Sequence, residues 1–141
     1  MASSISTDEK ARLCNAARKV AEAAYAPYSK FRVGAAILGE KGMHTAVNVE
    51  NASFGLSLCA ERAALAKAIS EGENVIRAIA VACVDATPGQ SSNEILPCGA
   101  CRQWMIELAM DAAIVICDVD GQSHDFALTE LMPLPFRLNI R

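Results

Sequence analysis

The chain has 141 residues, of which 52% are hydrophobic and 21% are charged, and its formal net charge is -3. A chain of this length is most simply a single domain, 1–141, which can bury a core without disulfide bonds or metals to hold it together. The acidic balance and the lack of a Lys and Arg cluster count against a nucleic-acid partner, because phosphate binding requires concentrated positive charge.

The beginning of the sequence is rich in serine and carries Asp8 and Glu9, and it lacks the basic and apolar regions of a signal peptide. No apolar run approaches the roughly 20 residues of a membrane span. We therefore expect a cytoplasmic protein with no membrane partner. The six cysteines do not suggest a disulfide framework, because the chain is large for that class and two of them are spaced as C-x-x-C.

Helical and strand patterns alternate along the chain, which predicts a layered α/β domain. Ser6 and Glu9 have the spacing of a capping box at the first helix, and Pro27 follows the end of that helix. The predicted elements are a helix over 6–24, strands over 31–38 and 44–50, a helix over 59–70, a strand over 75–84, a helix over 98–110, strands over 112–117 and 124–127, and a helical turn over 129–132.

Residues 75–84 are nearly all apolar, as expected of a central strand that is covered on both faces. Cys83 and Cys117 lie in apolar strand segments, and Cys14 lies near the apolar face of the first helix, so we expect these three cysteines in or near the core. Both histidines of the chain, His44 and His124, are expected to be exposed.

Two short stretches carry the chemistry: Cys59-Ala60-Glu61-Arg62 and Pro97-Cys98-Gly99-Ala100-Cys101-Arg102. Together they offer three thiols and one carboxylate. Three ligands suit a catalytic zinc, because the fourth position stays open for the reacting water. Each stretch begins a predicted helix, and the partial positive charge of a helix N-terminus lowers the pKa of a thiol.

Glu61 is the candidate proton carrier, since a carboxylate beside the reacting water can take its proton and deliver it to a leaving amine. Three thiolates around Zn²⁺ leave a net charge of -1, which weakens the metal as a Lewis acid. We expect Arg62 and Arg102 to offset this charge by hydrogen bonding to the thiolates.

A structural zinc in a non-catalytic binding module is the alternative from a different class. Such a site is closed by a fourth Cys or His, and Glu61 would then be dispensable. The remaining cysteines and both histidines do not form a second paired motif, which favours the catalytic interpretation.

The residues resemble the zinc deaminases, whose signature is H-x-E…P-C-x-x-C with a three-cysteine variant and a glutamate that is not a ligand. More closely, the chain resembles the small homotetrameric cytidine deaminases over roughly 8–136. The matching stretches are Tyr28-Ser29-Lys30-Phe31-Arg32-Val33-Gly34-Ala35-Ala36, Asn48-Val49-Glu50-Asn51-Ala52-Ser53, Cys59-Ala60-Glu61-Arg62 and Pro97-Cys98-Gly99-Ala100-Cys101-Arg102-Gln103.

The resemblance implies a three-layer α/β/α sandwich around a five-stranded mixed sheet, a Zn²⁺ cofactor, a pyrimidine nucleoside as substrate and a homotetramer with shared sites. It also implies a role for each matching position. Zinc would be held by Cys59, Cys98 and Cys101 with Glu61 as proton shuttle, and the substrate by Phe31 on the base, Asn48 and Glu50 on the ribose, Ala60 on the pyrimidine and Phe136 of a neighbouring subunit.

The sequence departs from the family pattern at three positions, Phe54, Leu96 and Trp104, which bear on substrate range and subunit packing. Blasticidin S deaminases share the cysteine motifs and remain an alternative, which Glu50 counts against because that carboxylate suits a ribose hydroxyl. A polynucleotide editor is a third possibility, and the net charge of -3 counts against it.

Overall fold

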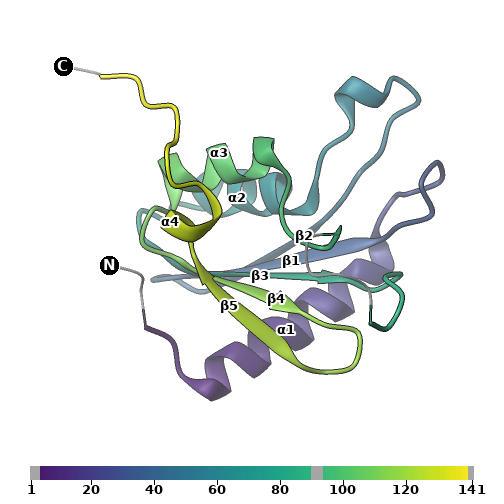
Figure 1. Cartoon of the computed structure of the whole chain (residues 1–141), viewed down its shortest axis with the longest axis horizontal. Helices are drawn as coiled ribbons and strands as arrows, with labels where there is room; N and C mark the ends of the chain where they lie inside the picture. Colours follow the sequence, from purple (N-terminus) through teal and green to yellow (C-terminus); the bar gives the residue numbers. More distant parts are fainter. Residues whose placement is uncertain (1–3, 90–93, 140–141) are drawn as a thin grey trace.

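The computed structural model describes residues 4–89 and 94–139. A five-stranded sheet lies between one helix on one face and two on the other (Figure 1). The elements are α1 (Thr7–Val20), η1 (Ala21–Ala23), β1 (Val33–Gly39), β2 (Met43–Val47), η2 (Phe54–Leu56), α2 (Ala60–Ser70), β3 (Ile76–Cys83), α3 (Gly99–Leu108), β4 (Ala113–Cys117), β5 (Ser123–Ala127) and α4 (Leu128–Leu131).

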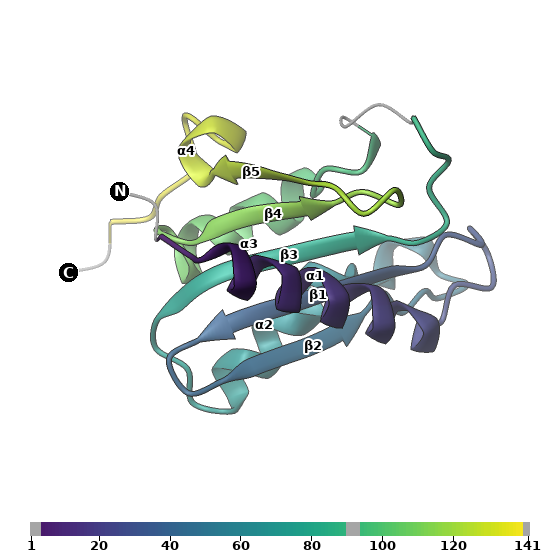
Figure 2. The same cartoon turned by 90° about the horizontal axis from the view of Figure 1, so that it is seen from below.

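The strand order is β2-β1-β3-β4-β5. Only β3 and β4 run parallel, and α3 lies in the connection between them, while β1 pairs with β2 and β3, and β4 with β5, in antiparallel fashion. Viewed from below, α1 runs across the sheet (Figure 2). The predicted α/β/α sandwich with a five-stranded mixed sheet is therefore confirmed.

The layer between α1 and the sheet is built from small side chains. The strands turn toward this helix a set of buried residues that is mainly alanine, namely Ala36, Ala78, Ala80, Ala82, Ala113, Val115 and Cys117. At Gly34 the approach is closest: a Cβ there would lie 2.0 Å from the main-chain oxygen of Ala17. A residue with a side chain at this position would push α1 away from the sheet.

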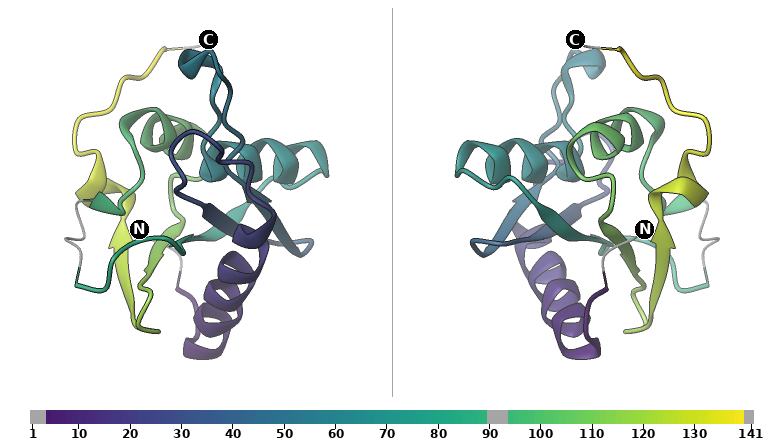
Figure 3. Two further views of the ribbon diagram at one scale, coloured as in Figure 1. Left: turned by 90° about the vertical axis from the view of Figure 1, so that its right-hand side faces the viewer. Right: turned by 90° about the vertical axis from the view of Figure 1, so that its left-hand side faces the viewer.

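The opposite layer holds larger side chains and carries α2 and α3 (Figure 3). Ile37, Leu65, Ile79, Met105 and Ile114 are fully buried there between the strands and the two helices. This layer fixes the start of each helix at one end of the sheet, where the motif cysteines lie. Within the described ranges, no helix has the length and apolar character to cross a membrane.

Element boundaries differ from the predicted ones by a few residues. The first helix ends at Val20 and continues as a 3₁₀ turn. The second strand ends at Val47 rather than at residue 50, because Val49 leaves the sheet and forms isolated bridges with Tyr25 and Leu58. The capping box of Ser6 and the glutamate three residues later is present, with both bonds at 3.0 Å.

The expectation that His44 is exposed is wrong. Its side chain is 7% exposed, and it lies between two carboxylates, with Nδ1 2.6 Å from Glu71 Oε2 and Nε2 3.0 Å from Glu73 Oε1. Burial of the ring is tolerated because both of its nitrogens have partners. His124 is half exposed, as expected, with Nε2 2.7 Å from Asp118 Oδ2.

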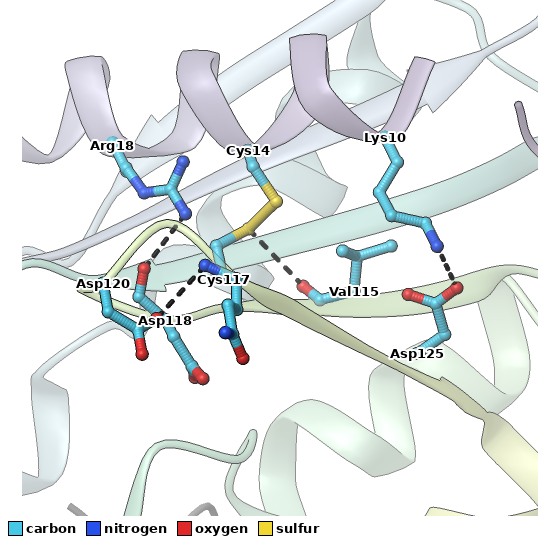
Figure 4. The surroundings of a disulfide bond; sticks show 9 residues. Lys10, Cys14, Arg18, Val115, Cys117, Asp118, Asp120 and Asp125 are labelled. Atoms are coloured by element: carbon cyan, nitrogen blue, oxygen red, sulfur yellow. Dashed lines mark hydrogen bonds and ion pairs between the residues drawn. A yellow bond between two sulfur atoms is a disulfide. The ribbon is translucent and has the colours of Figure 1, made fainter. Parts of the chain in front are cut away.

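The two cysteines described in the α1 layer are buried, as expected, and they are also joined. Cys14 on α1 and Cys117 on β4 form a disulfide (Figure 4). On either side of it, Arg18 donates to the main-chain oxygen of Asp118 and Lys10 pairs with Asp125. The sequence gives no sign of this pairing because the two cysteines are 103 residues apart.

Candidate active site

The three motif cysteines converge from two helix starts. Cys59 is the N-cap residue of α2 and Cys98 is the N-cap residue of α3, and both have an extended backbone. Neither side chain forms a capping hydrogen bond with its own helix. Cys101 lies one turn into α3 and is fully buried. Both helices therefore direct their partially positive ends toward the same group of sulfurs.

The spacing of the sulfurs fits a single metal ion. The Sγ atoms of Cys59, Cys98 and Cys101 all lie within 4.8 Å of one another. Cys98 Sγ is 3.9 Å from Cys59 Sγ and 3.5 Å from Cys101 Sγ. Sulfurs bound to one tetrahedral zinc at about 2.3 Å are separated by about 3.8 Å. The donor set, its softness and its spacing thus suit Zn²⁺.

The thiols are already biased toward the thiolate form. Hydrogen bonds from the Cys101 thiol and from Arg62 lower the pKa of Cys59 to about 5. The same Cys59–Cys101 contact, together with burial and the nearby Glu61 carboxylate, raises the pKa of Cys101. One thiolate therefore forms readily, whereas a second negative charge beside it needs a cation.

Glu61 lies in the first turn of α2, two residues after the first ligand, and is 5% exposed. Burial raises its pKa to about 7, and the Cys59 thiolate acts in the same direction. A carboxyl group with a pKa near neutrality can both accept and release a proton, which suits a general acid–base.

The two arginines that follow the cysteines differ in their contacts. Arg62 Nη2 donates to Cys59 Sγ at 3.3 Å. Its Nε is buried without a hydrogen-bond partner among the described residues. Arg102 instead donates from Nε to the Pro97 oxygen at 2.8 Å and from Nη1 to the Leu131 oxygen at 2.7 Å.

The expectation that Arg102 bonds to a thiolate is therefore wrong. Its guanidinium reaches main-chain oxygens on both sides of α3, because the side chain turns toward α4 rather than toward the sulfurs. Arg102 anchors the loop before Cys98 and the end of α4. It acts on the site through the main chain, and the direct contact with sulfur belongs to Arg62.

A cavity opens beside the thiols. It measures about 500 Å³ with its open mouth included. Phe31, Asn48, Ala60 and Glu61 line it together with Cys59 and Cys98. The structure thus brings together the metal ligands, the candidate proton carrier and three of the five predicted substrate contacts.

The Asn48 side chain faces the cavity and also binds the main chain next to it. Its Nδ2 donates to the main-chain oxygen of Phe31 at 2.9 Å, and its Oδ1 accepts from the main-chain nitrogen of Val33, also at 2.9 Å. The amide group can make further hydrogen bonds beyond these two, so a ribose contact remains compatible with this arrangement.

Glu50 and Phe136 lie outside the cavity in this single chain. The Glu50 carboxylate accepts from the main-chain nitrogens of Tyr28 and Ser29, each at 3.1 Å, and lines a second hollow. Phe136 is 72% exposed on the C-terminal tail, and its main-chain oxygen accepts from Gln103 at 3.0 Å. Both predicted substrate roles remain predictions.

The departures from the family pattern fall in three different places. Phe54 is exposed and packs edge-on against Tyr28, with ring centroids 5.9 Å apart. Trp104 is 41% exposed and lies beside Phe136 on the outside of α3. Leu96 lines the cavity itself, so it bears directly on what the site can hold.

Several cavity residues were not predicted from the sequence, namely Val33, Val81, Cys83, Glu94 and Ile95. Cys83 was interpreted only as a core residue, although it is the last residue of β3. Burial and the Glu61 carboxylate raise its pKa to about 12, which keeps it a thiol. Its place at the carboxyl end of a parallel strand was the available signal, since ligands of open α/β sheets bind there.

Comparison with known proteins agrees with this geometry. Residues 7–117 match the family model described as the cytidine and deoxycytidylate deaminase zinc-binding region. A cytidine deaminase from Halalkalibacterium halodurans is 42% identical over 130 residues, covering 91% of this chain and 94% of the relative. A blasticidin-S deaminase from Bacillus cereus is 30% identical over 115 residues, covering 79% and 81%.

Among solved structures, the crystal structure of cytidine deaminase from Burkholderia pseudomallei matches with a TM-score of 0.80 and 40% identity, covering 94% of this chain and all of that one. The matched residues run from the start of α1 to the end of β4. They include the two helix starts at which the motif cysteines lie. The chain belongs to the cytidine and deoxycytidylate deaminase family of zinc-binding enzymes.

Proposed function

We propose that the chain catalyses the hydrolytic deamination of cytidine and deoxycytidine to uridine and deoxyuridine, with release of ammonia, as a step of pyrimidine salvage. One observation carries the proposal: a buried carboxyl group, Glu61, lies beside three converging thiols at the wall of a cavity. A closed structural zinc site has no use for such a carboxyl group or for an adjoining cavity.

Cys59, Cys98 and Cys101 would hold the zinc, which when bound acts as a Lewis acid and makes a water molecule more acidic. Arg62 donates to the Cys59 sulfur at 3.3 Å and thereby withdraws negative charge from the ligand set. This contact offsets part of the excess charge of three thiolates around a divalent cation.

Glu61 moves the protons of the reaction. The carboxylate takes the first proton of the attacking water as oxygen adds to C4 of the pyrimidine, and it passes that proton to the ring nitrogen N3. It then transfers the second proton of the former water to the amino group, so that ammonia leaves as the C4–N bond breaks and the C4 carbonyl forms. Its burial keeps these transfers away from bulk water.

Phe31 and Ala60 are proposed to hold the pyrimidine, and Asn48 and Glu50 the ribose. Support for the first three comes from their place on the cavity wall. The Glu50 carboxylate lies in the second hollow with Tyr28, and each of its oxygens can accept more than one hydrogen bond. A nucleoside that extends from one hollow to the other would use both.

The active form is proposed to be a homotetramer in which Phe136 of one chain closes the site of another. Exposed apolar side chains support association, because monomeric proteins rarely leave them in contiguous groups. On the tail, Leu134 is 94% exposed and Phe136 and Leu138 are each 72% exposed, and η2 carries Phe54 and Leu56 at 74% and 72%. A cytoplasmic location also belongs to the proposal; the three free thiols of the site favour it, whereas the Cys14–Cys117 disulfide is a bond that is rare in that compartment.

The test is turnover by zinc-loaded protein. The loss of pyrimidine absorbance and the release of ammonia are followed with cytidine, deoxycytidine, free cytosine and blasticidin S in parallel. The proposal expects turnover of both nucleosides and much slower turnover of the other two. Absence of nucleoside turnover by protein that carries its full complement of zinc would overturn it.

A further inference from the structure

The wall of the cavity near Phe31 begins before the first strand. Phe31 and Val33 line the cavity, but β1 starts only at Val33. Lys30, the residue just before Phe31, has a φ of 59°, in the left-handed region that is uncommon for residues with a side chain. Residues 31 and 32 therefore lie between a turn and a strand, before the point at which the β1–β3 pairing starts.

Side chains supply most of the hydrogen bonds to the main chain of these two residues. Asn48 binds the main-chain oxygen of Phe31, as described above, and Ser29 Oγ accepts from the Phe31 nitrogen at 3.0 Å. The next residue is held by Asp85, whose Oδ2 accepts from the main-chain nitrogen of Arg32 at 2.7 Å. The Arg32 oxygen in turn accepts from the nitrogen of Val84 at 3.2 Å.

Asp85 also binds the side chain of the same arginine. Its Oδ2 accepts from Arg32 Nε at 2.9 Å and its Oδ1 from Nη2 at 2.8 Å, while Nη1 donates to Glu22 at 2.8 Å. The aspartate is about one quarter exposed and lies two residues beyond Cys83, which also lines the cavity and pairs with Val33. The β1–β3 pairing ends at Val33 and Cys83, so the carboxylate extends it by one residue.

We propose that Asp85 is a positioning residue, which fixes the main chain at Arg32 and thereby holds Phe31 in place on the cavity wall. The main-chain bond from the Arg32 nitrogen does this work, and the ion pair with the guanidinium only orients the carboxylate. The consequence for substrate binding rests on the proposed function, in which Phe31 contacts the pyrimidine.

Three variants separate the two parts of the contact. Asp85→Ala removes the main-chain acceptor and the ion pair together. Asp85→Asn keeps an oxygen for the Arg32 nitrogen, and Arg32→Ala keeps the main-chain bond but removes the ion pair. Asp125→Asn is the matched control. Like Asp85, Asp125 pairs with a cation, in this case Lys10, but it lies on β5 and is not among the residues that line the cavity.

The first measurement is steady-state kinetics on zinc-loaded protein with cytidine. Asp85→Ala is expected to raise KM about tenfold, the equivalent of one hydrogen bond, with kcat within about threefold of the parent. Asp85→Asn and Arg32→Ala are expected to stay within about threefold in KM, and Asp125→Asn to match the parent. An unchanged KM for Asp85→Ala would overturn the inference, and so would an equal rise in KM for Arg32→Ala.

The second measurement does not depend on turnover. Hydrogen exchange of the zinc-loaded protein, followed by mass spectrometry over peptides that contain residues 31–33, should be about tenfold faster in Asp85→Ala and unchanged in Asp125→Asn. If the parent does not deaminate cytidine, this exchange decides the positioning role while the proposed function fails. Unchanged exchange in Asp85→Ala would refute the positioning role.

Discussion

The two faces of the sheet hold their cysteines in different chemical states. On the face covered by α2 and α3, Cys59, Cys98 and Cys101 are free thiols that converge at two helix starts. On the face covered by α1, Cys14 and Cys117 form a disulfide within a layer lined mainly by alanine. The same residue type therefore supplies a metal site on one face and a covalent link on the other.

Placement within the elements accounts for the difference. Helix N-termini and the Arg62 guanidinium favour thiolates, and three sulfurs within 4.8 Å of one another have a spacing that suits one ion. The Cys14 side chain projects from the middle of α1 onto the end of β4, where small neighbours let it reach Cys117 directly. A neutral covalent bond suits an apolar layer better than a charged thiolate does.

The largest expected effect concerns the thiol face. Glu61→Gln removes the proton carrier but keeps the size and burial of the side chain, so kcat should fall by about 10²–10⁴-fold. Zinc content and the unfolding transition should not change, because Glu61 is not among the ligands. Glu107→Gln, an exposed change of the same kind on α3, is the control. Retained activity in the Glu61 variant would favour a non-catalytic zinc module.

The second effect concerns the disulfide face. The bond closes a loop of 103 residues. Removing it should lower the free energy of unfolding by about 2–5 kcal/mol, mainly because the unfolded chain gains conformational entropy. The measurement is urea unfolding of the parent and of Cys14→Ala/Cys117→Ala, each with and without a phosphine reductant. Cytidine turnover under native conditions should remain close to that of the parent.

The reductant distinguishes the covalent bond from packing. It should destabilise the parent and leave the double variant unaffected, whereas Cys83→Ala, a change at another buried cysteine, should remain sensitive. Alkylation of denatured, unreduced protein should label four of the six cysteines. Labelling of all six, with no response to the reductant, would mean that Cys14 and Cys117 only pack against each other.

The third effect compares the two arginines of the thiol face. Arg62→Gln removes a direct bond to sulfur and should lower zinc affinity or activity by about 10–100-fold, as is typical for partners of metal ligands. Arg102→Gln removes bonds to two main-chain oxygens and should lower stability by about 1–3 kcal/mol, with zinc retained. Metal analysis and urea unfolding of both variants give the answer, and equal zinc loss in both would contradict the distinction.

Sequence reasoning succeeded where the determining interactions are local. The helix starts at Cys59 and Cys98 follow from motif spacing and from the apolar pattern behind each cysteine. The strands follow from apolar runs, because a central strand such as residues 76–83 must be covered on both faces. Asn48 was assigned to the site, as a ribose contact, only through resemblance. No local pattern indicates it, because its contacts come from residues 31 and 33.

It failed where the determining contact joins distant segments. The close approach of α1 to the sheet pairs Cys14 with Cys117, and the geometry just before the start of β1 pairs Asp85 with Arg32. His44 is buried because two carboxylates from the α2–β3 connection reach it. None of these has a local pattern, and Arg102 shows that a residue next to a ligand can point elsewhere.

The smallest expected effect concerns Glu73, at the end of α2 opposite the thiols. His44 lowers its pKa, as does the main-chain nitrogen of Lys41, and Glu71 faces the other side of the same ring. A carboxylate with a depressed pKa stabilises the fold above its ordinary range, and this contribution is lost as the pH falls through the folded-state pKa. Glu73→Gln should therefore flatten the dependence of unfolding free energy on pH below about 5, by up to about one proton. Urea unfolding between pH 3 and 7 measures it, with Glu107→Gln as control; an unchanged slope would mean that Glu73 titrates alike in the folded and unfolded chain.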